Sequence, residues 1–240
     1  MSGYLHASAS RGLGADIAAL TSNNPTRAPS CRLSRTCTAP LTTAPCTPAG
    51  TWCTDMKDFR VNIPAGKIGT AEIDIFDITD QGAMMFNVGA RGRLVKAGRY
   101  TRLKINRELM MTDTPAEQRD HWYPLHNATG SVLITGLGIG MVVSACLQNP
   151  AVTDVTVIEI NPDVIALVGP HISSPKLTII NADALDWKPP KGKRYDLVWH
   201  DIWPDICGDN LPEMAKLKRR FARRTEWQGC WAQEQCRRSR

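Results

Sequence analysis

Four short apolar runs that alternate with helix-length segments predict an α/β fold whose main sheet is mostly parallel. The runs cover residues 132–134, 155–158, 177–180 and 195–199, and each leads into glycine or an acidic residue. Strands that alternate with helices form β-α-β units, in which neighbouring strands are parallel. A preceding stretch of alternating apolar and polar residues predicts a small antiparallel β domain. We therefore expect two structured parts, residues 56–111 and 112–240.

Residues 1–55 differ in composition from the rest of the chain. They are rich in Ala, Ser, Thr, Pro and Gly, and Asp16 and Asp55 are their only acids. Such a segment buries too little apolar surface to offset the entropy of ordering it. We expect it to be disordered, or to be a non-native extension upstream of a start near Met56.

Residues 56–111 show the pattern of half-buried strands. Apolar and polar residues alternate in 59–63, 71–76 and 100–105, as they do when one face of a sheet is buried. Turns between these strands are expected at four glycines: Gly82, Gly89, Gly92 and Gly98.

The second part opens with a helix start. Thr114, Pro115 and Glu117 occupy the N-cap, N1 and N3 positions of a capping box, which gives Glu117 a structural role. Asp113 and Asp120 have no such structural role in the pattern and are therefore candidates for functional residues. A second helix is expected to open at Asn161-Pro162.

Three glycines follow the first parallel strand at alternate positions, Gly136, Gly138 and Gly140. A dinucleotide site would need its third glycine at position 141, which is Met141. The G-x-G-x-G spacing instead suits a nucleoside without phosphates. Glu159, at the end of the second strand, can accept hydrogen bonds from ribose hydroxyls, and Asp183, after the third, can bind an adenine amino group.

These residues resemble the core of class I S-adenosylmethionine-dependent methyltransferases, and more narrowly the spermidine synthase (aminopropyltransferase) branch. The resemblance covers roughly residues 70–206, and its motifs are residues 108–121, 131–140 and 195–204. It implies a Rossmann-like domain that binds S-adenosyl-L-methionine or its decarboxylated form. The residues implied in binding are Gly136, Gly138, Gly140, Glu159, Ile160, Asp183 and Ala184, and Asp201 stands at the position of the catalytic acid.

The chain also departs from that branch. Ile139 replaces an Asp that contacts the transferred aminopropyl region, Asp120 replaces a Tyr, and Pro204 replaces the second Asp of a D-x-x-D-P motif. The resemblance therefore supports nucleoside binding by this chain more strongly than it supports polyamine synthesis. We expect Asp201 and Asp120 to be the catalytic residues.

Three functions remain open from the sequence. The first is methyl transfer to an unidentified small-molecule acceptor that Asp201 positions or deprotonates. The second is aminopropyl transfer to an amine, for which Asp113, Asp120, Asp201 and Asp205 would supply a negative field. The third is a non-catalytic relative that keeps the nucleoside site.

The end of the chain is basic and short. Residues 216–240 contain nine Lys or Arg and two Glu, so they account for the whole net charge of +6. A solvated helix face explains this better than a nucleic-acid patch, because 211, 214, 217 and 221 form an apolar stripe. No clear pattern predicts a fifth strand or a further antiparallel pair. We expect a sheet trimmed at its C-terminal edge, covered by another segment or by a second subunit in a homodimer.

The composition excludes several classes of protein. No apolar run is long enough to span a membrane. The eight cysteines form no C-x-x-C pair and no cluster with zinc spacing, so no metal site is expected. We expect reduced thiols and a cytoplasmic protein.

Overall fold

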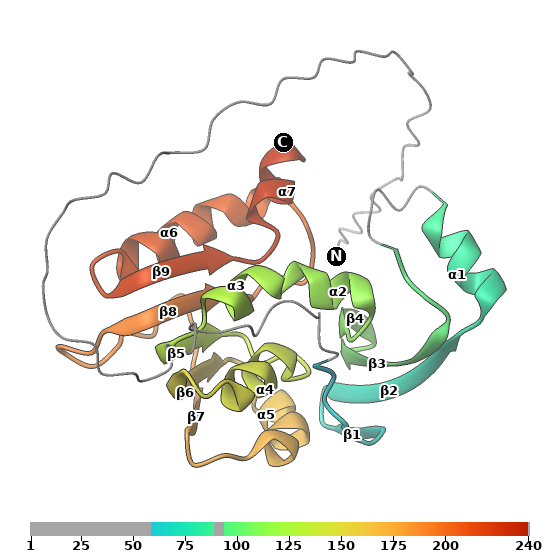
Figure 1. Ribbon diagram of the computed structural model, residues 1–240, viewed down its shortest axis with the longest axis horizontal. Helices are drawn as coiled ribbons and strands as arrows, with labels where there is room; N and C mark the ends of the chain where they lie inside the picture. Colours follow the sequence, from blue (N-terminus) through green and yellow to red (C-terminus); the bar gives the residue numbers. More distant parts are fainter. Residues whose placement is uncertain (1–58, 89–93, 240) are drawn as a thin grey trace, which may run out of the picture. The chain divides into compact units, whose positions relative to one another are not determined.

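A computed structural model describes residues 59–88 and 94–239 (Figure 1). The expectations for residues 1–55 and for turns at Gly89 and Gly92 lie outside these residues. The described chain contains a four-stranded antiparallel sheet followed by a five-stranded parallel sheet with helices. The predicted fold class, a Rossmann-like α/β domain preceded by a small β domain, is confirmed.

The small sheet has the order β1-β2-β3-β4: Gly66–Ile68, Ala71–Ile78, Gly98–Ile105 and Glu108–Thr112. The two strands predicted at 71–76 and 100–105 are present as β2 and β3. Residues 59–63 bury alternate side chains, Val61 and Ile63, but form no strand. The turn expected at Gly82 is wrong, because Gly82 lies in helix α1 (Asp80–Asn87) and donates its amide to the Thr79 hydroxyl.

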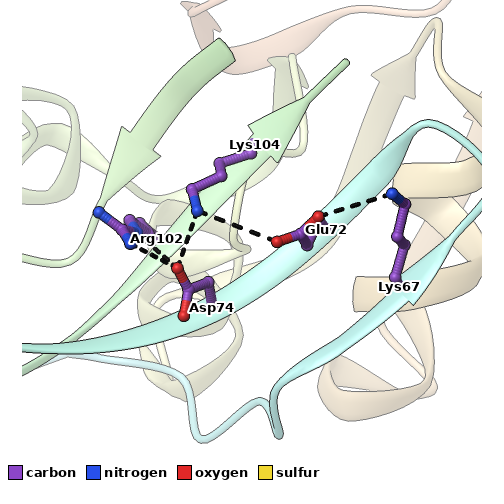
Figure 2. A network of polar contacts seen from close by, with 5 residues as sticks. All are labelled: Lys67, Glu72, Asp74, Arg102 and Lys104. Carbon is purple, nitrogen blue, oxygen red and sulfur yellow. Dashed lines mark hydrogen bonds and ion pairs between the residues drawn. The ribbon is translucent and has the colours of Figure 1, made fainter. Parts of the chain in front are cut away.

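Charged side chains on one face of the small sheet link β2 to β3 (Figure 2). The Asp74 carboxylate accepts hydrogen bonds from Arg102 Nε and Lys104 Nζ, both at 2.8 Å. These two cations lower the pKa of Asp74 to about 2. Ile73 and Leu103 pair in the same register but point to the opposite, buried face. The polar network therefore helps to fix the register that presents Leu103 to the candidate site.

The main sheet has the order β7-β6-β5-β8-β9, and all of its strands are parallel. Its strands are β5 (Gly130–Thr135), β6 (Val152–Glu159), β7 (Leu177–Asn181), β8 (Tyr195–His200) and β9 (Thr225–Cys230). The connecting helices are α4 (Met141–Gln148), α5 (Pro162–Val168) and α6 (Leu211–Phe221), and α7 (Gln233–Arg238) follows β9. Two short helices, α2 (Pro115–Asp120) and α3 (Trp122–Asn127), join the two sheets.

Both faces of the main sheet are buried, as expected for parallel strands. Ile134, Val157 and Leu197 belong to one hydrophobic cluster, which also contains Ile73 and Leu103 of the small sheet. The adjacent residues Leu133, Ile158 and Val198 belong to a second cluster. The second cluster contains the predicted stripe of α6, since Met214, Leu217 and Phe221 are fully buried and Leu211 packs against them.

The fifth strand, for which the sequence shows no clear pattern, is present as β9. Its sequence, Thr-Glu-Trp-Gln-Gly-Cys, includes a glycine at its fifth position. Gly229 is needed there, because a Cβ would meet the rings of Trp199 and Trp227 at 2.8 and 2.9 Å. The described residues contain no antiparallel pair beyond β9, so the sheet has one strand more than expected at this edge and then ends.

Candidate functional site

A cavity of about 430 Å³ lies at the carboxyl ends of the parallel strands. The strand order reverses at β5. The chain runs from β5 through β6 to β7 on one side, and then returns to place β8 on the other side of β5. Ligands of open α/β sheets bind at such a point. The small sheet supplies an apolar wall to the same cavity through Leu103, Ile105, Met110 and Met111.

The glycine loop forms part of the cavity lining through Gly136 and Gly138. Gly136 has φ +95°, and a Cβ there would overlap the carbonyl oxygen of Asp201, so only glycine fits between β5 and β8. Gly140 is the N-cap of α4 and lies outside the lining. The Ile139 side chain is also outside it, since that residue is 1% exposed within the main core.

Glu159 lies at the end of β6, lines the cavity and is 8% exposed. Its Oε2 accepts a hydrogen bond from the Leu137 amide and its Oε1 accepts one from the Asn161 amide, both at 2.8 Å. These bonds fix the carboxylate between the glycine loop and the start of α5. Each oxygen keeps a lone pair with which to accept a ligand hydroxyl.

The loop after β7 brings Asp183 and Ala184 to the cavity. Asp183 Oδ1 accepts a hydrogen bond from the Leu185 amide at 2.7 Å, and Ala184 is buried. Ile160, after β6, lines the cavity but is 64% exposed, which places it at the rim.

Arg220 of α6 holds this loop in place. Its Nη1 donates to the carbonyl oxygens of Ala184 and Trp187 at 2.7 and 2.9 Å, and its Nη2 donates to that of Leu185. The expectation that Arg220 belongs to a solvated basic face is therefore wrong. A planar guanidinium can donate to three carbonyl oxygens at once. No local sequence pattern indicates that Arg220 makes these contacts.

Asp201 follows β8, lines the cavity and has a side chain that is 16% exposed. Burial raises the pKa of this carboxyl well above its ordinary value, and the negative charges of Glu117 and Asp120 raise it further. The Nε2 of the fully buried His121 lies 3.7 Å from Asp201 Oδ2. Asp120 is half-buried at the end of α2 and is not part of the lining, so it reaches Asp201 through its charge.

Three acids near this site differ from expectation. The capping box is absent, because Thr114 makes no side-chain cap, and Glu117 lines the cavity instead. Asp113 is structural, since it is 2% exposed and accepts the Thr101 amide at 2.7 Å, and burial raises its pKa. Asp205 is exposed and outside the lining.

Several lining residues were not indicated by the sequence. These are Glu213, Trp231, Met110 and Met111. Glu213 Oε2 accepts a hydrogen bond at 2.9 Å from the indole N–H of Trp203, a lining residue that the sequence did offer as a pocket wall. The amphipathic pattern of α6 indicates that Glu213 lies in the first turn of the helix, away from the apolar stripe. It does not indicate that the Glu213 side chain faces the cavity, because this depends on tertiary packing.

The charge of the lining has one sign. Among the described residues, five acids line the cavity and no Lys, Arg or His does: Glu117, Glu159, Asp183, Asp201 and Glu213. An apolar wall facing several carboxylates favours a ligand that is both partly apolar and positively charged.

Comparisons with known proteins give matches to solved structures alone; no family model and no curated protein matches the chain. A spermidine synthase from Thermotoga maritima matches with 17% identity and a TM-score of 0.37, covering 68% of this chain and 53% of that one. An N-methyltransferase from Bradyrhizobium japonicum in complex with S-adenosyl-L-homocysteine matches with 16% identity and a TM-score of 0.36, covering 46% and 57%. An S-adenosylmethionine-dependent methyltransferase from Mesorhizobium loti matches with 14% identity and a TM-score of 0.33, covering 41% and 47%. The chain thus spans about half the length of these structures.

Two further findings concern the described residues as a whole. No group of three or more His, Cys, Asp or Glu among them could hold a metal ion. None of the helices that they form has the length and apolar character needed to cross a membrane.

Proposed function

We propose that this chain is a transferase that binds S-adenosyl-L-methionine, or its decarboxylated form, and transfers a group to a small-molecule acceptor beside Asp201. The observation that carries the proposal is that the ends of four parallel strands, β5 to β8, bring the glycine loop, Glu159, Asp183 and Asp201 to one cavity. Methyl transfer is the first form of this function.

The nucleoside half of the cavity suits an adenosine. Glu159 offers two oxygens, held by backbone amides, to the two ribose hydroxyls. Asp183 and Ala184 would contact the adenine, and Leu103 and Ile105 give an apolar wall to a planar base. The glycine loop leaves room for the ribose to lie against backbone.

The acceptor half contains the group that could remove a proton. A sulfonium donor supplies an already activated carbon, so the protein has to align a nucleophile and accept its proton. As the nucleophile bonds to that carbon, the carbon–sulfur electron pair returns to sulfur, and the nucleophile's proton passes to the Asp201 carboxylate. A raised carboxyl pKa makes Asp201 a stronger base than an exposed aspartate once it is ionised.

One observation favours aminopropyl transfer as a second candidate function. The part of the lining that the structure describes contains five acids and no basic side chain, so none of these residues pairs by charge with a donor carboxylate. Glu117 and Asp201 would attract an amine acceptor, and a decarboxylated donor has a more positive net charge because it lacks the carboxylate.

Product analysis tests both forms. The full-length chain is incubated with either donor and a panel of amines, and the nucleoside products are identified by mass spectrometry. Methyl transfer releases S-adenosylhomocysteine, whereas aminopropyl transfer releases methylthioadenosine. Formation of neither product, together with no calorimetric binding of either nucleoside, would reject the proposed function; binding without turnover would favour the non-catalytic alternative.

A further inference from the structure

Met111, the last residue but one of β4, lies directly on the glycine loop. The Ile139 amide donates a hydrogen bond to the Met111 sulfur at 3.5 Å. A Cβ at Gly138, where φ is +52°, would lie 2.5 Å from the same sulfur. The small sheet thus covers the loop on which a nucleoside ligand would rest.

The amides of this loop differ in the acceptors they already have. The Leu137 amide donates to the carboxylate of Glu159 at 2.8 Å, and the Gly136 amide donates to the Ile158 carbonyl at 2.8 Å. The Ile139 amide donates to a thioether, which is a weak acceptor. Replacing this acceptor therefore costs less than replacing either of the others.

A ligand carboxylate needs a hydrogen-bond donor, and the described residues that line the cavity include no Lys, Arg or His. A carboxylate forms stronger hydrogen bonds to backbone amides than a neutral acceptor does. The Ile139 amide becomes available to it when the Met111 side chain moves away.

We propose that Met111 is a displaceable cap on the Ile139 amide and that it sets how well the site accepts a donor with a carboxylate tail. This inference rests on the proposed function. A ligand with an amino-acid tail takes the Ile139 amide and moves Met111, whereas the same nucleoside without that tail leaves Met111 in place. Met111 is thereby a specificity-determining residue for the donor.

Methyl NMR of the full-length protein tests this directly. The protein is labelled with ¹³C at the methionine methyl groups, and the Met111 signal is assigned by its loss in Met111→Leu. S-Adenosylhomocysteine should shift this signal strongly, and methylthioadenosine, which lacks the amino-acid tail, should shift it much less. An unmoved Met111 signal at saturating S-adenosylhomocysteine would overturn the inference.

Calorimetry of substituted proteins gives a second test. Met111→Ala should tighten S-adenosylhomocysteine binding relative to methylthioadenosine by about tenfold, the scale of exchanging a weak hydrogen bond for a charged one. Met110→Ala, which removes a neighbouring methionine of the same lining, should change both affinities alike. Equal changes in Met111→Ala would contradict the inference. If the unsubstituted protein binds neither nucleoside, the proposed function itself fails. If it binds both nucleosides and the Met111 signal does not respond to S-adenosylhomocysteine, only the cap fails.

Discussion

Asp201 is a carboxyl group whose surroundings oppose its ionisation. Burial removes water from it, and Glu117 and Asp120 add negative charge nearby. Such a group takes up a proton more readily than an exposed aspartate, which suits a base that must receive one from a nucleophile. The same surroundings make the ionised form costly for the folded state.

We therefore predict that Asp201→Asn abolishes turnover and leaves nucleoside affinity unchanged, because the amide cannot accept the proton. In the unsubstituted protein, turnover should rise with pH through the raised pKa of Asp201, above the range of an ordinary aspartate near pH 4. Rate measurements with a turned-over acceptor at several pH values check this. A rate that is already at its maximum at pH 4 would contradict it.

The stability of the protein should follow the opposite trend. A carboxyl whose pKa is raised on folding favours the folded state below its unfolded pKa and loses this contribution as pH rises through the folded pKa. Asp201→Asn should therefore have a higher Tm than the unsubstituted protein at pH 7, and the difference should shrink towards pH 4. Thermal unfolding followed by circular dichroism measures the Tm of both proteins at each pH. An Asp201→Asn protein that is less stable than the unsubstituted protein at pH 7 would argue against a raised pKa of Asp201.

Glu159 is the residue that we propose to bind the ribose hydroxyls. Glu159→Gln should weaken methylthioadenosine binding by about 1–3 kcal/mol, because the new amide group must face either the Leu137 or the Asn161 N–H. Glu226→Gln on β9 is the matched control, since Glu226 is exposed and pairs with Arg194 at the surface. Calorimetry should show unchanged affinity in the control. Unchanged affinity in Glu159→Gln would remove Glu159 from the site.

At the scale of elements, α6 supports the site through Arg220. The guanidinium donates to Ala184, Leu185 and Trp187, so the loop after β7 depends on a helix that follows β8. This arrangement explains how a loop with few buried side chains can present Asp183 to a ligand.

We predict that Arg220→Met weakens methylthioadenosine binding by about tenfold, because three carbonyl oxygens lose a charged donor. Arg219→Met, on the exposed side of the same helix, is the control and should leave affinity unchanged. Backbone NMR shifts of residues 183–187 should move in the first variant only. Equal affinities in both variants would show that the loop holds its shape without Arg220.

The elements that the sequence predicted well are those whose pattern is local. Buried parallel strands are continuous apolar runs that end on polar residues, so the positions of Glu159, Asp183 and Asp201 followed from the sequence. The fifth strand did not, because Gly229 and the polar residues of β9 hide its pattern and its place depends on packing against Trp199. Glu117 matched a capping box, but Thr114 makes no such cap and Glu117 lines the cavity instead.

At the scale of the whole molecule, the cavity depends on two sheets. The parallel sheet supplies the polar strand ends, and the small antiparallel sheet supplies the apolar wall that includes Met111. The alternation of apolar and polar residues predicts that one face of β3 and β4 is buried, but not what that face contacts. Its contact with the cavity is set by tertiary packing. The buried members of the three hydrophobic clusters in the described residues lie between positions 61 and 236.

Removal of residues 1–55 should leave folding and nucleoside binding intact, because a segment rich in Ala, Ser, Thr, Pro and Gly offers too little apolar surface to pack on a core. The expected Tm and methylthioadenosine affinity of the shortened chain equal those of the full chain. A fall in Tm of more than about 4 °C, which corresponds to roughly 1–2 kcal/mol for a protein of this size, would show that the segment contributes to stability.

The most direct test of the central claim, that this cavity binds an adenosyl donor, is a crystal structure of the full chain with methylthioadenosine. We predict ribose hydroxyls on the Glu159 carboxylate, the adenine beside Asp183 and Ala184, and the thioether directed towards Asp201. Density for the nucleoside elsewhere, or an empty cavity at saturating ligand, would contradict the account.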